Sequence, residues 1–122
     1  MPDRIVFVVG GDASFRRAAT QSLADSGGLQ AVSMAGGTSL LPLARSARPA
    51  AIVIDLATPD LDAGTLLGRL DSATDTRGIP IVGVLGEGDD AAPPAGVAAL
   101  LHRPLGHAAI VDAVRALLQT TR

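Results

Sequence analysis

The chain has 122 residues, a length that suits one domain with a substantial core and is too short for two. Hydrophobic residues make up 48% and charged residues 18%, which favours a folded globule over a disordered chain, and the absence of cysteine excludes disulfides, thiolate metal sites and thiol catalysis. The net charge of −2, the scattered arginines and the scarcity of aromatics argue against a nucleic-acid-binding surface.

Strands and helices are predicted to alternate along the whole chain. In chain order we expect a strand at 5–9, a helix from Asp12 or Ser14 to about Ala24, a strand at 29–34, a helix at 39–47 capped by Thr38, a strand at 51–54, a helix around 63–70, a strand at 79–85, a strand at 97–101 and a last helix around 110–118. The runs at 5–9, 51–54 and 79–85 are β-branched and apolar without alternation. This is typical of strands that helices cover on both faces.

Helical periodicity supports the segments between the strands. Apolar residues repeat at i, i+3, i+4 and i+7 in Ala63, Leu66, Leu67 and Leu70, and again in Ile110, Val114, Leu117 and Leu118. In the first helix we expect one face to hold Phe15, Ala18, Ala19, Ser22 and Leu23. The segment 86–96 is a poor helix, since it holds glycines, two Asp and a Pro-Pro pair, and we expect at most a turn or two there.

This alternation predicts an α/β fold in one domain, residues 1–122. The fold is a doubly wound, five-stranded parallel sheet of (βα)5 type, for which the flavodoxin-like strand order 2-1-3-4-5 is a common solution. In such sheets the site lies beyond the carboxyl ends of the strands, between strands 1 and 3. This rule indicates Gly10-Gly11-Asp12 and Asp55 as site residues.

Four segments carry further motifs, and they occur in order at consistent separations. They are residues 8–17 (VVGGDASFRR), 52–64 (IVIDLATPDLDAG), 79–86 (IPIVGVLG) and 100–105 (LLHRPL). Together they resemble the receiver domain of two-component response regulators over essentially the whole chain. The second segment is similar to the phosphoacceptor loop, with Pro59 four positions after Asp55, and the fourth is similar to the family's Lys-Pro-Phe.

The resemblance implies that Asp55 is the equivalent of the phosphorylated aspartate. It also implies a Mg²⁺ ion held by two paired acids, by Asp55 and by the backbone carbonyl of Ala57. The paired acids align with Gly10 and Gly11, which have no side-chain ligands, and Asp12 comes one residue too late. We therefore expect no metal and no cofactor, with Asp12, Asp55 and Ala57 as weak candidates, and Mg²⁺ only if Asp55 is phosphorylated.

Two further positions depart from the family pattern. The family's switch Thr or Ser aligns with Leu85, which cannot hydrogen-bond a phosphoryl oxygen. The family's Lys aligns with Arg103. The chain contains no lysine, so no other register restores that residue. A guanidinium keeps the charge but not the compact donor of an ammonium. Because a buried carboxylate is costly without a partner, we expect Arg103 to pair with Asp55 or Asp12.

The leading hypothesis is a degenerate receiver, or pseudo-receiver, that signals through protein contacts, without an enzymatic activity and independently of phosphorylation. One alternative is a conventional receiver phosphorylated on Asp55 by a histidine kinase. Another is a small-ligand sensor that uses the vacated site. The two histidines, His102 and His107, and the acid pairs Asp60/Asp62 and Asp89/Asp90 are interpreted as surface, loop or capping residues.

The expected partners are a signalling protein or histidine kinase, or a second copy that binds through the face formed by the fourth helix position, the fifth strand and the last helix. No apolar run approaches the ~18 residues of a membrane span, and no secretory signal is visible, so we expect a cytoplasmic protein that contacts neither membrane nor nucleic acid. The use of Arg in place of Lys and the bias toward Ala and Gly suggest a bacterial source. The partner, the pathway, the oligomeric state and any effector domain after Arg122 are not readable from the sequence.

Overall fold

The computed structural model describes residues 4–59, 61–89, 95–106 and 108–120. Its elements are β1 (Arg4–Val9), α1 (Ala13–Asp25), β2 (Leu29–Met34), α2 (Leu40–Ala47), β3 (Ala51–Asp55), α3 (Ala63–Ser72), β4 (Ile81–Leu85), β5 (Ala99–His102) and α4 (Ala109–Thr120). All strand pairs are parallel and the strand order is β2-β1-β3-β4-β5, as predicted.

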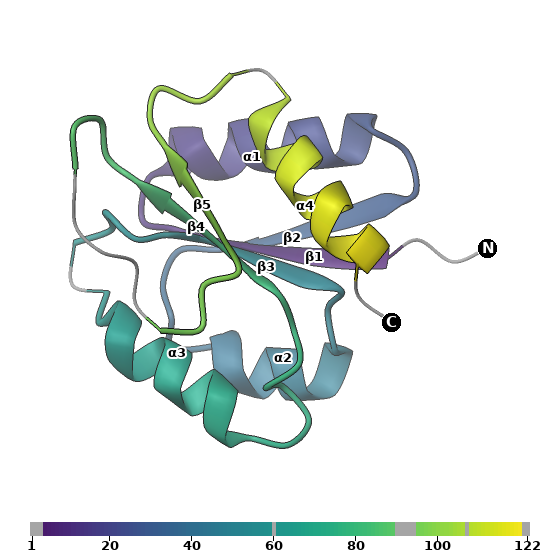
Figure 1. The fold of residues 1–122 in the computed structure, drawn as a ribbon, viewed down its shortest axis with the longest axis vertical. Coiled ribbons are helices and arrows are strands. Elements are labelled where there is room, and N and C mark those ends of the chain that lie inside the picture. Colours follow the sequence, from purple (N-terminus) through teal and green to yellow (C-terminus); the bar gives the residue numbers. More distant parts are fainter. Residues whose placement is uncertain (1–3, 60, 90–94, 107, 121–122) are drawn as a thin grey trace.

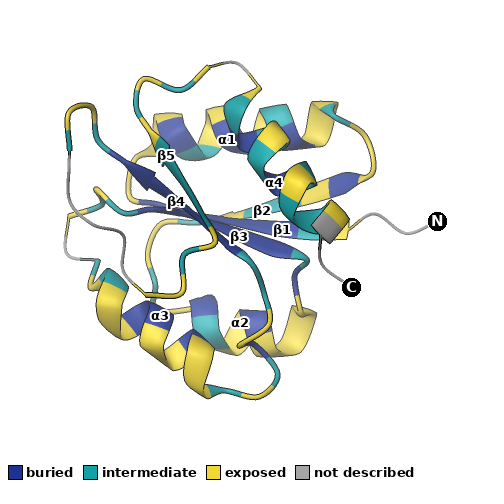
Figure 2. Cartoon of the chain, viewed as in Figure 1, coloured by how far each residue is buried: buried dark blue, intermediate teal, exposed yellow. Residues whose placement is uncertain are grey.

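Helices cover the sheet on both faces (Figure 1). On one face α1 and α4 pack against Val6, Val8, Val53 and Val82, and on the other α2 and α3 pack against Phe7, Val9, Ile52 and Ile54. The central strands β3 and β4 are buried along their whole length (Figure 2). This double burial explains why their sequences are apolar without alternation.

Two of the helix starts follow the predicted capping chemistry. The side chain of Asp12 accepts a hydrogen bond from the Ser14 N–H, 2.9 Å away, and Asp62 accepts from the Thr65 N–H at 3.1 Å. The Thr65 N–H, and then the Thr65 hydroxyl, stabilise the charged carboxylate and lower the pKa of the exposed Asp62 below its ordinary value of 3.8. The interpretation of Asp62 as a capping acid is confirmed.

The prediction of Thr38 as the cap of α2 is wrong. The N-cap is Ser39, and its side chain makes no capping hydrogen bond. The helix begins instead with a backbone turn, in which the Leu40 N–H donates to the Gly37 carbonyl at 3.1 Å. The backbone carbonyl of Gly37 therefore accepts a hydrogen bond at this helix start, where we expected the hydroxyl of Thr38 to be the acceptor.

The face predicted for α1 is too wide. Phe15, Ala19 and Leu23 are buried, at i, i+4 and i+8, whereas Ala18 is exposed. Ala18 lies instead at a hollow of about 440 Å³ between α1 and α4. Two strands also begin later than predicted, since β4 starts at Ile81 and β5 at Ala99.

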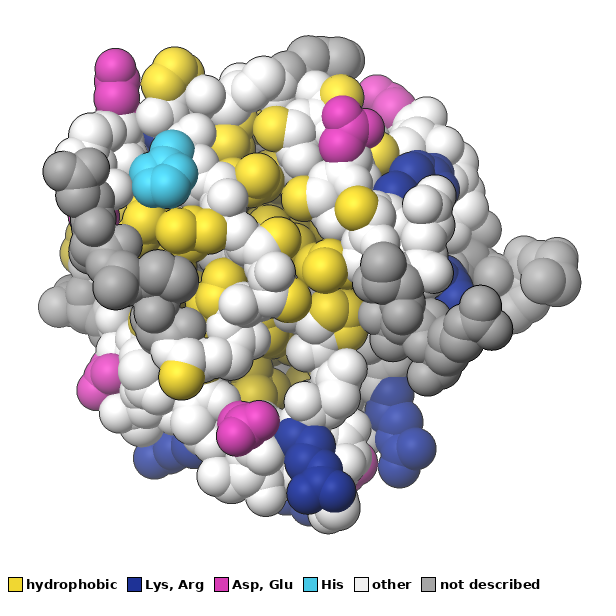
Figure 3. Space-filling view, viewed as in Figure 1, with side chains coloured by type: hydrophobic (Ala, Val, Ile, Leu, Met, Phe, Trp, Pro, Cys, Tyr) yellow, Lys and Arg dark blue, Asp and Glu magenta, His cyan; other side chains and the backbone are white. Residues whose placement is uncertain are grey.

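The connection from β4 to β5 differs most from a regular βα unit. Within its described parts, residues 86–89 and 95–98, the backbone forms turns and no helix, in agreement with the poor helix composition. The sheet at Gly83 of β4 is covered by Leu56, Val97 and Leu100, whose terminal carbons would lie 2.7–3.4 Å from a Cβ at that position. Figure 3 shows apolar side chains gathered on this side of the molecule, where β5 forms the sheet edge. Within the described part of the chain, no helix combines the length and apolar character that crossing a bilayer requires.

Candidate functional site

The carboxyl ends of four strands bring the predicted site residues together. Gly10 follows β1, Asp55 ends β3, Leu85 ends β4 and Arg103 follows β5. Because β1, β3, β4 and β5 are consecutive neighbours in the sheet, residues far apart in sequence meet at one edge. The backbone N–H of Arg103 donates to the Leu85 carbonyl at 3.0 Å, which fixes where the arginine leaves the sheet.

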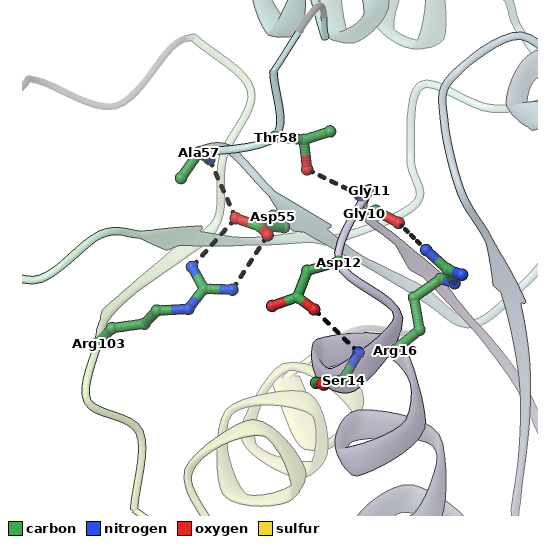
Figure 4. A network of polar contacts seen from close by, with 9 residues as sticks. All are labelled: Gly10, Gly11, Asp12, Ser14, Arg16, Asp55, Ala57, Thr58 and Arg103. Atoms are coloured by element: carbon green, nitrogen blue, oxygen red, sulfur yellow. Dashed lines mark hydrogen bonds and ion pairs between the residues drawn. The ribbon is translucent and has the colours of Figure 1, made fainter.

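Asp55 and Arg103 form a two-pronged ion pair at the centre of this edge (Figure 4). One guanidinium nitrogen, Nη1, donates to Oδ1 at 3.1 Å, and the other, Nη2, donates to Oδ2 at 3.0 Å. The Ala57 N–H donates to Oδ1 as well, at 3.0 Å. The Asp55 side chain is only 5% exposed, against 27% for Arg103. The predicted pairing of Arg103 is confirmed, and its partner is Asp55.

A phenyl ring holds the guanidinium from the side of α1. The Arg103 guanidinium carbon lies 5.0 Å from the centroid of the buried Phe15 ring, a cation–π distance. A Cβ on Gly10 would lie 3.0 Å from the Asp55 Cβ and 3.2 Å from the ring edge of Phe15. The glycine therefore leaves the space that the ring and the ion pair fill. Sequence reasoning assigned Phe15 only to the helix core, and no local pattern relates it to Arg103.

Gly11 is similarly enclosed. Its N–H donates to the Thr58 hydroxyl oxygen at 3.2 Å, and a Cβ at this position would lie 3.0 Å from the Thr58 Cγ2. The Gly10 carbonyl accepts a hydrogen bond from Arg16 at 2.7 Å. The backbone bends at Gly11, and Thr58 and Arg16 hold the Gly-Gly segment by these hydrogen bonds. The sequence singled out neither of them as a site residue.

The hydrogen bonds that hold the Asp55–Arg103 ion pair include none to the side chains of the remaining candidate residues that the structure describes. Asp12 uses its carboxylate to cap α1, Leu85 presents a buried aliphatic side chain, and His102 is exposed. His107, Asp60 and Asp90 lie outside the described residues.

With Arg103 paired to Asp55, these residues do not fit a magnesium ion of the kind that the resemblance implies. Mg²⁺ requires oxygen ligands in near-octahedral geometry. Both oxygens of Asp55 already accept from a cation, and Gly10 and Gly11 supply no side chain. Within the described ranges, no three His, Asp or Glu side chains gather as a metal-binding group.

Comparisons with known structures agree with this architecture. A candidate response regulator from Chloroflexus aurantiacus superposes with a TM-score of 0.86 at 23% identity, covering 96% of this chain and 98% of that one. A sensor protein from Polaromonas gives 0.83 at 20% identity over 99% and 100%, and a response regulator receiver domain protein from Clostridium thermocellum gives 0.82 at 16% over 96% and 95%. No protein-family model and no curated protein matches the sequence. The chain therefore has the fold of response regulator receiver domains.

Proposed function

We propose that this chain is a receiver-type signalling domain that acts through protein–protein contacts, has no enzymatic activity and is not switched by phosphorylation. One observation carries the proposal. The carboxylate that would accept a phosphoryl group is buried, and both of its oxygens are held by Arg103. The proposal also draws on the receiver fold that the chain shares with signalling proteins.

Phosphoryl transfer to Asp55 would require a free carboxylate oxygen in line with an incoming anion. Here each oxygen accepts from the guanidinium, and the acids that would hold a charge-neutralising metal are replaced by glycines. Leu85 also supplies no hydroxyl for a transferred phosphoryl oxygen. Loss of one such preorganised electrostatic partner typically costs about 10²–10³ in rate, so the combined loss is expected to abolish transfer on a signalling timescale.

The partner surface that we propose lies along the β5 edge and α4. Leu100 and Leu101 of β5 and Leu117 and Leu118 of α4 are half-buried, so part of their apolar surface is available to another protein. The occupant would be a signalling protein, a histidine kinase or a second copy of the chain. The small-ligand hypothesis draws less support, because the guanidinium and the Phe15 ring fill the space beside Asp55.

Beryllofluoride with Mg²⁺, a stable mimic of the aspartyl phosphate, tests the proposal directly. We expect the amide NMR spectrum of the wild-type chain to be unchanged by the mimic, as in an Asp55→Asn control. Chemical-shift changes at Gly10–Asp12, Asp55–Ala57 and Leu85–Gly86 in the wild type, absent from the control, would contradict the proposal. They would favour a conventional receiver phosphorylated on Asp55 by a histidine kinase.

A further inference from the structure

The buried carboxylate of Asp55 needs a positive charge beside it, whether or not it is ever phosphorylated. A carboxylate that is only 5% exposed needs a cation close by, because burying an unpaired charge is strongly unfavourable. In the described structure this cation is the Arg103 guanidinium, whose two terminal nitrogens match the two carboxylate oxygens at 3.0 and 3.1 Å. The planar fork of arginine suits this arrangement, whereas an ammonium would reach one oxygen well and the other poorly.

Three contacts hold the guanidinium in place. Asp55 binds it from the end of β3, and the Phe15 ring lies beside it from α1. The backbone N–H of Arg103 donates to the carbonyl of Leu85 at the end of β4. The position of the ring depends in turn on Gly10, because a Cβ there would lie 3.2 Å from it. Contacts from β3, β4 and α1 therefore fix the position of the Arg103 side chain, which leaves the sheet at the end of β5.

A divalent ion at the same carboxylate would face this fixed positive charge. The two positive charges would repel each other, and little solvent would screen them at a carboxylate that is only 5% exposed. The ion would also have to take at least one oxygen from the guanidinium, and the two glycines next to Asp55 offer no replacement ligand. The carboxylate of Asp12, which also caps α1, faces the same space in Figure 4.

We propose that Arg103 is the resident cation of this site and that it and a divalent metal ion exclude each other at Asp55. Mg²⁺ at physiological concentrations then leaves the contacts of Asp55 in the wild-type domain unchanged. Removal of the guanidinium, with the carboxylates of Asp55 and Asp12 left in place, opens the site to a divalent ion. The proposed function and this inference both rest on the contacts between Asp55 and Arg103.

A Mg²⁺ titration of three proteins tests this inference: the wild type, Arg103→Met and the double variant Arg103→Met/Asp55→Asn. Methionine keeps an unbranched apolar stem against the Phe15 ring and removes the charge. Asparagine in the double variant removes the buried negative charge that the ion would bind. The readouts are the melting temperature and the amide shift of Ala57, whose N–H reports on the Asp55 carboxylate.

We expect Mg²⁺ to leave the wild type and the double variant unchanged and to stabilise Arg103→Met. An ion that binds the folded state and not the unfolded one raises the melting temperature of a 122-residue chain by about 5 °C once Mg²⁺ exceeds its dissociation constant tenfold. The Ala57 amide should shift over the same Mg²⁺ range. If Arg103→Met folds only with Mg²⁺, its refolding yield with and without the ion replaces the melting temperature.

Two results would overturn the inference. A saturable Ala57 shift in the wild type would mean that the ion and the guanidinium coexist. An Arg103→Met variant that does not respond, or that responds as the double variant does, would mean that the guanidinium is not what excludes the ion. Exclusion of Mg²⁺ from the wild type also predicts that beryllofluoride with Mg²⁺ leaves its spectrum unchanged. An Arg103→Met variant that does not respond to Mg²⁺ would overturn this inference alone and would leave the proposed function standing.

Discussion

The fit around Gly10 gives the sharpest prediction, because the smallest possible side chain should already disturb the site. In Gly10→Ala the new methyl carbon would lie 3.0 Å from the Asp55 Cβ and 3.2 Å from Phe15. Carbon atoms ordinarily approach to about 3.5–4.0 Å, so the two contacts are short by at least about 0.5 and 0.3 Å. Asp55 is 4% and Phe15 7% exposed, and both are packed in the interior, so neither can move away freely.

The size of the effect follows from two opposing contributions. Adding a methyl group to a well-packed interior typically costs about 1–3 kcal/mol. Replacing glycine by alanine also restricts the unfolded chain, which stabilises the folded state by about 0.4–1 kcal/mol. We expect Gly10→Ala to lower the free energy of unfolding by about 1–2 kcal/mol. Gly10→Asp, which restores the first acid of the family pattern, should cost more, since its carboxylate would stand beside that of Asp55.

Urea unfolding followed by circular dichroism measures this difference, with Gly86→Ala as the matched control. Gly86 follows β4 at the same edge of the sheet, and a Cβ there would meet no atom within 4 Å. The control should unfold at the same urea concentration as the wild type, or at a slightly higher one. If Gly10→Ala were as stable as Gly86→Ala, the reasoning would be refuted, because the site would then have room for the side chain that it lacks.

Three further predictions concern neighbouring contacts. Gly11→Ala should lose about 1 kcal/mol of stability through its contact with the Thr58 methyl group, and adding Thr58→Ser should restore most of it in urea unfolding, since serine keeps the hydroxyl and removes the methyl. The stabilisation that Asp62 gains from its lowered pKa is present above the unfolded-state value and is lost as pH falls through the folded-state value. The stability advantage of the wild type over Asp62→Asn should therefore shrink on acidification below about pH 4, and an advantage constant down to pH 2 would contradict this. Arg115→Met should cost about 1–2 kcal/mol in urea unfolding, because Arg115 donates to carbonyls at the C-terminus of α1 at 2.6 and 2.9 Å, whereas Arg69→Met on an exposed face should change stability by less than about 0.5 kcal/mol.

The sequence by itself determined the order and type of the elements. The uninterrupted β-branched runs of β1, β3 and β4 predicted strands buried on both faces, and apolar spacing predicted the helices between them. Parallel strands with right-handed crossovers leave few topologies, and the observed strand order is the common one that we expected among them. Strand ends at one edge of such a sheet must meet, and this is why Asp55 and Gly10 were predictable as neighbours. Arg103 was added to them by the resemblance to receiver domains.

The details of the site were decided only by the tertiary structure. Of the two carboxylates open to Arg103, Asp55 is the partner because it is the buried one, and Asp12 is occupied with capping α1. The role of Phe15 depends on the distance between a helix and a strand end that are joined only through the sheet. The apolar spacing of the helix predicts that Phe15 faces inward, but it does not indicate which charged group lies beside the ring. Contacts of this kind arise from packing in three dimensions, and no spacing along the chain encodes them.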